Sequence, residues 1–132
     1  MDVTALGYER GVIPDMDNSV FHSDSRLFDV AVKSIEEANL SVKVFTGRVV
    51  SGDQFIAGKE KKDDLVNTFA GDCAEMEGAS IAHAAYVNNI PCLIIRAISD
   101  KADGSAEMDY PTFEKKAAAN SIKILKQLIK NL

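Results

Sequence analysis

Residues 91–100 read Pro-Cys-Leu-Ile-Ile-Arg-Ala-Ile-Ser-Asp, and this segment opens with the longest apolar run of the chain. The run ends at Arg96, well short of the roughly 20 apolar residues that a membrane span needs. Apolar side chains at successive positions are typical of a parallel central strand, which is covered on both faces. We therefore expect Cys92–Ile98 to be a strand that is buried on both faces.

Helix and strand patterns alternate outward from this run. The sequence predicts helices after Ser23-Asp24-Ser25, over 59–69, over 78–88 and from Tyr110, and further strands over 42–50 and 73–76. The last helix should turn one apolar face inward, made of Phe113, Ala117, Ile122, Leu125, Ile129 and Leu132. Such alternation predicts an α/β fold with three layers, helix–sheet–helix, around a mixed, mostly parallel sheet.

The length is that of a whole domain, whereas the number of predicted strands is lower than that of a whole sheet. A chain of 132 residues has the length of one domain. The three predicted strands fall below the five or six of an average sheet. Either the pattern conceals further strands, or residues 1–132 form a single domain that is an incomplete part of a larger fold, and we expect the second.

Charge and cysteine content exclude several classes of function. There are 15 basic and 20 acidic residues, so the net charge is −5, which disfavours a nucleic-acid partner. Cys73 and Cys92 are too few for a disulfide framework or a zinc site. Both lie among apolar residues, which favours buried free thiols in a reducing compartment. With no signal peptide and no membrane span in the sequence, we expect a cytoplasmic protein.

Ser51–Ile56 is the first of three segments that could carry chemistry. It follows a predicted strand directly, and ligands of open α/β sheets bind at the carboxyl ends of strands. Phe55 could stack on a planar ring there, or it could lie in the core, as buried phenylalanines commonly do.

Glu75-Met76-Glu77-Gly78, at a strand-to-helix junction, is the second segment. Its carboxylates could accept hydrogen bonds from a sugar diol, and Met76 offers a soft apolar surface for a ring. Alternatively, Glu77 only stabilises the first turn of a helix. Glu75 then needs a buried partner, for which Arg96 is the candidate.

Ser99-Asp100, at the end of the expected central strand, is the third segment. A carboxyl group in an apolar mouth has a raised pKa, so Asp100 could donate a proton near neutral pH. Equally, either side chain could cap a turn. No spacing links His22 and His83 to a metal site or a catalytic triad, and packed or surface histidines are the better interpretation.

Together these motifs are more specific than any one of them. In order and spacing they resemble the 5′-methylthioadenosine/S-adenosylhomocysteine nucleosidase family, of the purine nucleoside phosphorylase-like superfamily. The resemblance extends from Asp2 to the last helix. The motifs that carry it are Asp2–Glu9, Gly11–Pro14, Ser51–Ile56, Ala74–Gly78 with Ile81-Ala82-His83, and Ile95–Asp100.

The resemblance implies hydrolysis of an N-glycosidic bond without a metal or an organic cofactor. Adenine and the 5-thioribose product would be released from 5′-methylthioadenosine or S-adenosylhomocysteine. Asp100 would be the general acid on the purine N7, with Ser99 supporting it. Around the base, the resemblance places Phe55 in a stack on adenine and the backbone of Ile56 in a hydrogen bond to it.

Further roles follow from the same resemblance. Glu77 would bind the ribose diol, Met76 would lie against the ribose, and Glu75 would stand near the site. Tyr110 would lie near the 5′-alkylthio group. In the family's homodimer, positions matching Leu6, Tyr8 and Pro14 reach into the neighbouring subunit's site.

The family's chain also has an N-terminal half that this sequence lacks, which supplies the glutamate that activates water. We therefore expect the isolated chain to be inactive, and to pair with that half or with a second copy. Two alternatives stay open: a purine nucleoside phosphorylase that uses phosphate, and a non-catalytic module for nucleoside binding or dimerisation. Futalosine and other purine nucleosides also remain possible substrates.

Overall fold

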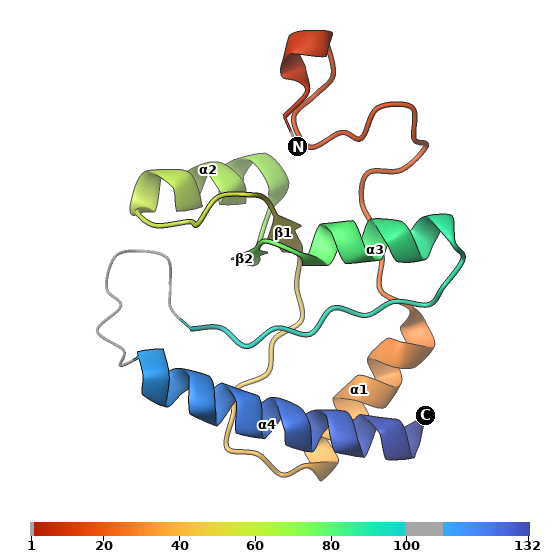
Figure 1. The fold of residues 1–132 in the computed structure, drawn as a ribbon, viewed down its shortest axis with the longest axis vertical. Helices are drawn as coiled ribbons and strands as arrows, with labels where there is room; N and C mark the ends of the chain where they lie inside the picture. Colours follow the sequence, from red (N-terminus) through yellow and green to blue (C-terminus); the bar gives the residue numbers. More distant parts are fainter. Residues whose placement is uncertain (1, 100–109) are drawn as a thin grey trace.

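The computed structural model describes residues 2–99 and 110–132 (Figure 1). Within these ranges, no helix has both the length and the apolarity to cross a membrane. A short 3-10 turn over Thr4–Leu6 precedes the main elements. These are α1 Ser25–Glu37, β1 Val49–Ser51, α2 Lys59–Phe69, β2 Cys73–Glu75, α3 Gly78–Val87 and α4 Tyr110–Asn131.

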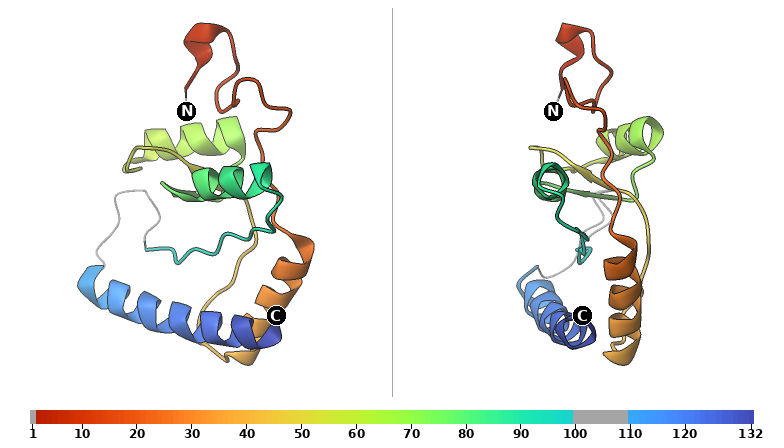
Figure 2. Two further views of the ribbon diagram at one scale, coloured as in Figure 1. Left: turned by 45° about the vertical axis from the view of Figure 1, so that its right-hand side comes forward. Right: turned by 90° about the vertical axis from the view of Figure 1, so that its right-hand side faces the viewer.

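The two strands form a parallel pair in which Val49 lies opposite Cys73 and Ser51 lies opposite Glu75. α2 and α3 flank this pair on opposite sides (Figure 2). The α/β class with parallel strands is therefore confirmed. Both strands run in the same direction, and their last residues, Ser51 and Glu75, are opposite each other. These two residues therefore lie side by side at the carboxyl-terminal end of the pair.

The segment expected to be the central strand is not a strand. Cys92–Ile98 is extended, but it joins no sheet in the described structure, and it runs between α3 and α4 (Figure 1). Its end is open to water, with Ile95 48% and Ile98 58% exposed. A strand exists through hydrogen bonds to its neighbours, and in the described part of the chain this segment is paired with no strand.

Two other expectations need correction for the same reason. The strand expected over 42–50 is reduced to Val49–Ser51, and Phe45 before it is 83% exposed. Cys73 and Cys92 are free thiols, but they are half-buried rather than buried. A sheet of two strands covers too little surface to bury these side chains.

α1 begins where the sequence predicts, and it packs along α4. Asp24 caps it, because its carboxylate accepts the Leu27 amide at 2.9 Å. Ser34 of α1 is completely buried, and the Asn131 side chain of α4 donates to its hydroxyl at 3.0 Å. Glu37 accepts a second bond from Asn131 at 2.8 Å, so polar contacts tie the two helices together.

The apolar face expected on α4 is only partly buried. Phe113 and Ala117 are half-buried as expected. The remaining four side chains are exposed, namely Ile122 (54%), Leu125 (55%), Ile129 (63%) and Leu132 (53%). α4 buries the stripe that faces α1, where Gln127 donates to Glu37 at 2.7 Å. A helix with one packed neighbour buries one stripe, and its other apolar stripe stays open.

Candidate active site

The ends of β1 and β2 are joined by one serine side chain. The Ser51 hydroxyl donates a hydrogen bond to the Glu75 carboxylate, and its oxygen accepts the Ala79 amide at 2.8 Å. The Gly52 amide also donates to the Glu75 carbonyl at 3.1 Å. The start of α3 is therefore bonded to both strands. Sequence analysis gave Ser51 no role of its own, because its partner depends on the strand register.

Glu75 is a buried acid whose partners are internal. Its side chain is 3% exposed, and its carboxylate accepts the Gly78 amide at 2.7 Å and the Glu77 amide at 3.2 Å. The first amides of a helix have no partner within the helix, so this carboxylate satisfies the start of α3. Gly78 fits because it has no Cβ: an added Cβ would lie 2.9 Å from Glu75 Oε1.

Arg96 links Glu75 to Glu77. Its Nη1 lies 3.5 Å from Glu75 Oε2, and its Nη2 lies 3.4 Å from Glu77 Oε2. The interpretation that Glu75 would take Arg96 as its partner is confirmed. The one guanidinium thus faces a buried carboxylate and an open one.

These contacts decide the charge of Glu75. Burial alone would raise the pKa of its carboxyl group. The hydrogen bond from Ser51, the two amides and the charge of Arg96 outweigh burial and hold the pKa below its ordinary value. Glu75 is therefore ionised at neutral pH. Burial also raises the pKa of the neighbouring Cys73 thiol, which keeps it protonated.

The other predicted site residues of the two loops are open to solvent. Met76 is 50% exposed, and the Glu77 side chain is 55% exposed. Phe55 is 76% exposed, so the alternative that it lies in the core is wrong. Ile56 beside it is half-buried. An aromatic ring, a thioether and a carboxylate are thus presented by loops that follow the ends of β1 and β2.

Three predicted residues belong to the last motif and to α4. Ser99 is half-buried. Asp100 lies outside the described residues. Tyr110 is the first residue of α4, and its side chain also falls outside the description.

The predicted dimer-side residues lie on the N-terminal arm, which projects from the rest of the chain (Figure 1). Leu6 is 73% and Tyr8 37% exposed, and Pro14 is half-buried. The arm is tied to α2 by Arg10, which binds Asp64 through two bonds of 2.6 and 2.9 Å. It therefore presents Leu6 and Tyr8 outward from an anchored base.

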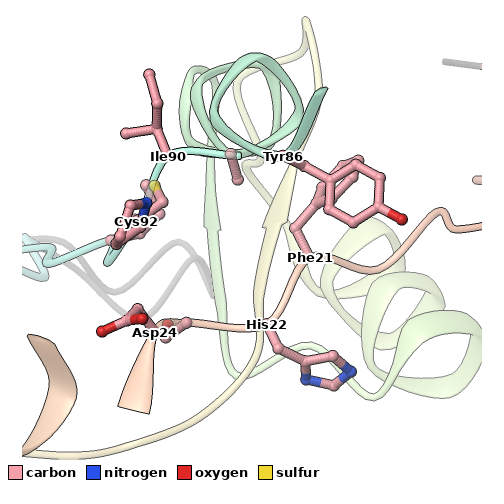
Figure 3. A pocket seen from close by; sticks show the side chains of 10 residues that line it. Phe21, His22, Asp24, Tyr86, Ile90 and Cys92 are labelled. Carbon is pink, nitrogen blue, oxygen red and sulfur yellow. The ribbon is translucent and has the colours of Figure 1, made fainter. Parts of the chain in front are cut away.

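A hollow of about 190 Å³ lies between the segment before α1, α3 and the segment after α3, and not at the loops that follow β1 and β2 (Figure 3). No predicted site residue lines it. The lining comes from residues 21–24 before α1, from Ala82 and Tyr86 of α3, and from Ile90, Pro91, Cys92 and Ile94 after α3. Beside it, Phe21 stacks on His83 with ring centroids 5.4 Å apart and also contacts Tyr86. His83 is thus a packed histidine, as expected.

In the described ranges, no three His, Cys, Asp or Glu side chains are grouped so that they could hold a metal ion. What the strand ends offer is hydrogen-bonding and stacking groups. An open carboxylate held by an arginine can bind hydroxyl groups, and an exposed ring can stack on a planar base.

The chain is similar in sequence to a family of known proteins. A sequence profile described as the phosphorylase superfamily matches residues 1–130. The 5′-methylthioadenosine/S-adenosylhomocysteine nucleosidase of Staphylococcus aureus (strain JH9) is 38% identical over 99% of this chain and 57% of its own length.

Solved structures agree. The Neisseria meningitidis nucleosidase of the same name, in complex with methylthio-immucillin-A, is 36% identical, with a TM-score of 0.87 over 100% of this chain and 57% of that one. The futalosine hydrolase of Helicobacter pylori strain 26695 is 35% identical, with a TM-score of 0.85 over 99% and 55%. The chain spans little more than half the length of these relatives. The resemblance drawn from its motifs is confirmed, and the chain belongs to the phosphorylase superfamily.

Proposed function

We propose that this chain forms the purine- and ribose-binding part of a nucleosidase. The enzyme would hydrolyse the N-glycosidic bond of 5′-methylthioadenosine and S-adenosylhomocysteine. The observation that carries the proposal is the contrast within Glu75-Met76-Glu77. Glu75 is buried and paired, whereas Met76 and Glu77 are open beside the end of the strand pair. The names of the relatives supply the substrate class.

Each open group has a matching part of the nucleoside. Glu77 binds the 2′- and 3′-hydroxyls of the ribose, and Met76 lies against the sugar. Phe55 stacks on adenine, and the backbone of Ile56 hydrogen-bonds the base. Tyr110 lies near the 5′-alkylthio group. The exposure of Phe55, Met76 and Glu77 supports these roles, since a ligand-binding group must be reachable.

Proton transfer makes the base a leaving group. As the bond from C1′ to the base breaks, the sugar becomes oxocarbenium-like and the purine gains negative charge. Asp100 donates its proton to N7, with Ser99 supporting it. Water adds to C1′, and its proton passes to the water-activating group that the further N-terminal part would supply. Such general acid catalysis contributes about 10²–10⁴-fold to a rate. Asp100 lies outside the described residues, so its role rests on its place in the motif.

The start of α3 is not a phosphate site. Helix N-termini commonly bind phosphate. Here the Glu75 carboxylate already accepts the Gly78 and Glu77 amides, and a second anion would be repelled. A phosphorylase would have to bind its phosphate elsewhere, so the phosphate requirement of the reaction distinguishes the two alternatives.

The proposal includes a larger assembly. The chain spans 57% of the Staphylococcus aureus relative, and we propose that residues 1–132 form one domain that works with a further N-terminal part and as a homodimer. Leu6, Tyr8 and Pro14 would then reach the partner subunit's site, which the exposure of Leu6 and Tyr8 supports. The isolated chain would be inactive without a water-activating group. We place the reaction in the cytoplasm, in keeping with two free thiols.

Adenine release tests the proposal. The chain would be assayed with 5′-methylthioadenosine in phosphate-free buffer. The chain would be assayed by itself and after co-expression with the part of the Staphylococcus aureus relative that it does not match. We expect release from the co-purified assembly only, and its loss in Asp100→Asn.

Other outcomes would overturn parts of the proposal. Release that requires added phosphate would make the protein a phosphorylase. Binding of methylthio-immucillin-A by the assembly without turnover of any nucleoside would make it a binding module. Because one structural relative is a futalosine hydrolase, futalosine is assayed in parallel. Faster release of its base than of adenine would make futalosine the preferred substrate in place of 5′-methylthioadenosine.

A further inference from the structure

We propose that Glu75 is a positioning residue, which orients Glu77 both through Arg96 and through the first turn of α3. Sequence analysis grouped Glu75 with the substrate-binding residues, and this inference gives it a different task. It rests on the proposed function, since it takes Glu77 as the ribose ligand. The arrangement of Glu75 itself is independent of any ligand.

Glu75 has no oxygen to offer a nucleoside. Its Oε1 accepts from the Ser51 hydroxyl and from the Gly78 amide at 2.9 Å. Its Oε2 accepts the Glu77 and Gly78 amides and faces Arg96 Nη1 at 3.5 Å. The Gly78 amide is shared by both oxygens, so these contacts come from four donor groups, which match the about four acceptor sites of a carboxylate. With 3% of the side chain exposed, a sugar hydroxyl has no access to it.

Arg96 is held mainly by its ion pair with Glu75. Its segment, Cys92–Ile98, belongs to no strand in the described structure, so no sheet ladder fixes the backbone there. Its side chain is 40% exposed, and its ion pair with the open Glu77 is screened by water. The buried Glu75 carboxylate is the less screened partner. Glu75 therefore anchors the guanidinium from which Nη2 reaches Glu77.

Glu75 also holds the backbone of Glu77. The Glu77 amide donates to Glu75 Oε2 at 3.2 Å, directly before the first residue of α3. Glu77 is thus fixed at two points, its amide and its carboxylate, and both connections lead to Glu75. Ser51 reinforces the arrangement, because its oxygen accepts the next free amide of the helix, that of Ala79.

These connections restrict where the Glu77 carboxylate can point. A binding group that is already oriented loses less conformational entropy when its ligand arrives. Neutralising Glu75 should release Arg96 and loosen Glu77 without removing any atom that touches the nucleoside.

Three variants of the 132-residue chain separate this role from a general loss of structure. Glu75→Gln removes the charge and keeps the shape. Arg96→Gln cuts the link to Glu77 and leaves the start of α3 capped, so it remains informative if Glu75→Gln does not fold. Glu37→Gln is the matched control, because Glu37 is also a hydrogen-bonded acid but joins α1 to α4.

Two readouts are taken on each variant. NMR follows hydrogen exchange of the Gly78 and Ala79 amides and of the Arg96 guanidinium. Calorimetry measures the affinity for 5′-methylthioadenosine and for its 2′-deoxy analogue, which lacks one hydroxyl of the diol. If the chain alone binds neither compound, calorimetry is repeated on the co-purified assembly.

In Glu75→Gln we expect faster exchange of the Arg96 guanidinium and of both amides. We also expect a loss of affinity for 5′-methylthioadenosine of about tenfold or more, the size expected for one hydrogen bond to a charged group. The 2′-deoxy analogue should lose less. Arg96→Gln should give the same affinity pattern with normal amide exchange, and Glu37→Gln should change neither readout.

Unchanged Arg96 exchange and unchanged affinity in Glu75→Gln would overturn the inference. An equal loss for both nucleosides would also overturn it, because the effect would then not pass through the diol. If wild-type assembly binds no nucleoside while Arg96 and the amides respond to Glu75→Gln, the proposed function fails and the anchoring by Glu75 stands.

Discussion

The hydroxyl of Ser51, the last residue of β1, donates a hydrogen bond to the carboxylate of Glu75, the last residue of β2. The two residues stand opposite each other in the parallel register. Because the Ser51 oxygen also accepts the Ala79 amide, a single side chain connects both strands to α3. The stability of this junction should therefore depend on Ser51 more than on other serines nearby.

Replacing Ser51 with alanine should lower the free energy of unfolding by about 1–3 kcal/mol, because it removes one donor from a buried carboxylate and the acceptor of the Ala79 amide. Urea unfolding followed by circular dichroism measures the change. Ser80→Ala is the control: Ser80 is exposed on α3, and its hydroxyl donates to the Glu77 carbonyl at 2.7 Å. Equal losses in the two variants would contradict the importance of the Ser51 contact.

Gly78→Ala should also destabilise the chain. The added methyl group would stand 2.9 Å from Glu75 Oε1 and 3.1 Å from its Cδ. Overpacking of this kind costs about 1–3 kcal/mol. At Gly52, by contrast, an added Cβ meets nothing within 4 Å, so Gly52→Ala should leave the unfolding midpoint nearly unchanged. A tolerated Gly78→Ala would show that Glu75 can move away.

Acid should destabilise the folded chain partly through Glu75. Its folded pKa lies below its ordinary value of 4.5, so its ionised form contributes stability that is fully present above pH 4.5. That contribution is lost as the pH falls through the folded pKa. The groups that lower the pKa of this carboxyl group are the Ser51 hydroxyl, the Gly78 and Glu77 amides and the charge of Arg96.

Unfolding measured between pH 7 and pH 2 checks this expectation in wild type and in Glu75→Gln. Other acids with lowered pKa values, such as Glu37 and Asp64, titrate in both proteins, so the difference between the curves isolates Glu75. The two curves should converge toward low pH. Parallel curves would mean that Glu75 has the same pKa in the folded and unfolded chain.

Two exposed phenylalanines offer a test of the proposed contact between Phe55 and the base. Phe55 is 76% and Phe45 is 83% exposed, and neither should matter much for stability. Stacking of a base on an aromatic ring contributes about 1–3 kcal/mol, so Phe55→Ala should weaken binding of 5′-methylthioadenosine about tenfold or more. Phe45→Ala should leave it unchanged. Calorimetry measures both affinities, on the chain or the co-purified assembly, whichever binds the nucleoside. Equal affinities of Phe55→Ala and Phe45→Ala would show that Phe55 does not contact the base.

Features set by neighbours in the sequence could be predicted. The start of α1 follows from Asp24, whose side chain caps amides only three residues away. The partner of Glu75 could be predicted as well, because a buried acid needs a cation and Arg96 lies on an otherwise apolar run.

Features set by distant segments could not. Cys92–Ile98 has the composition of a central strand, but strand formation requires pairing with another strand, and in the described part of the chain this segment is paired with none. On α4, the apolar residues Ile124 and Leu128 are half-buried together with Gln127 and Asn131, and only the packing against α1 shows that this is the covered side. The contact between Ser51 and Glu75 likewise exists only in one register.

The open apolar stripe of α4 has a consequence for the behaviour of the chain at high concentration. Ile122, Leu125 and Ile129 present adhesive surface, and at pH 7 the net charge of −5 keeps molecules apart. That repulsion vanishes near the isoelectric point of about 5.0 and is screened by salt. Light scattering should therefore rise as the pH approaches 5, and charged substitutions on this stripe should suppress the turbidity.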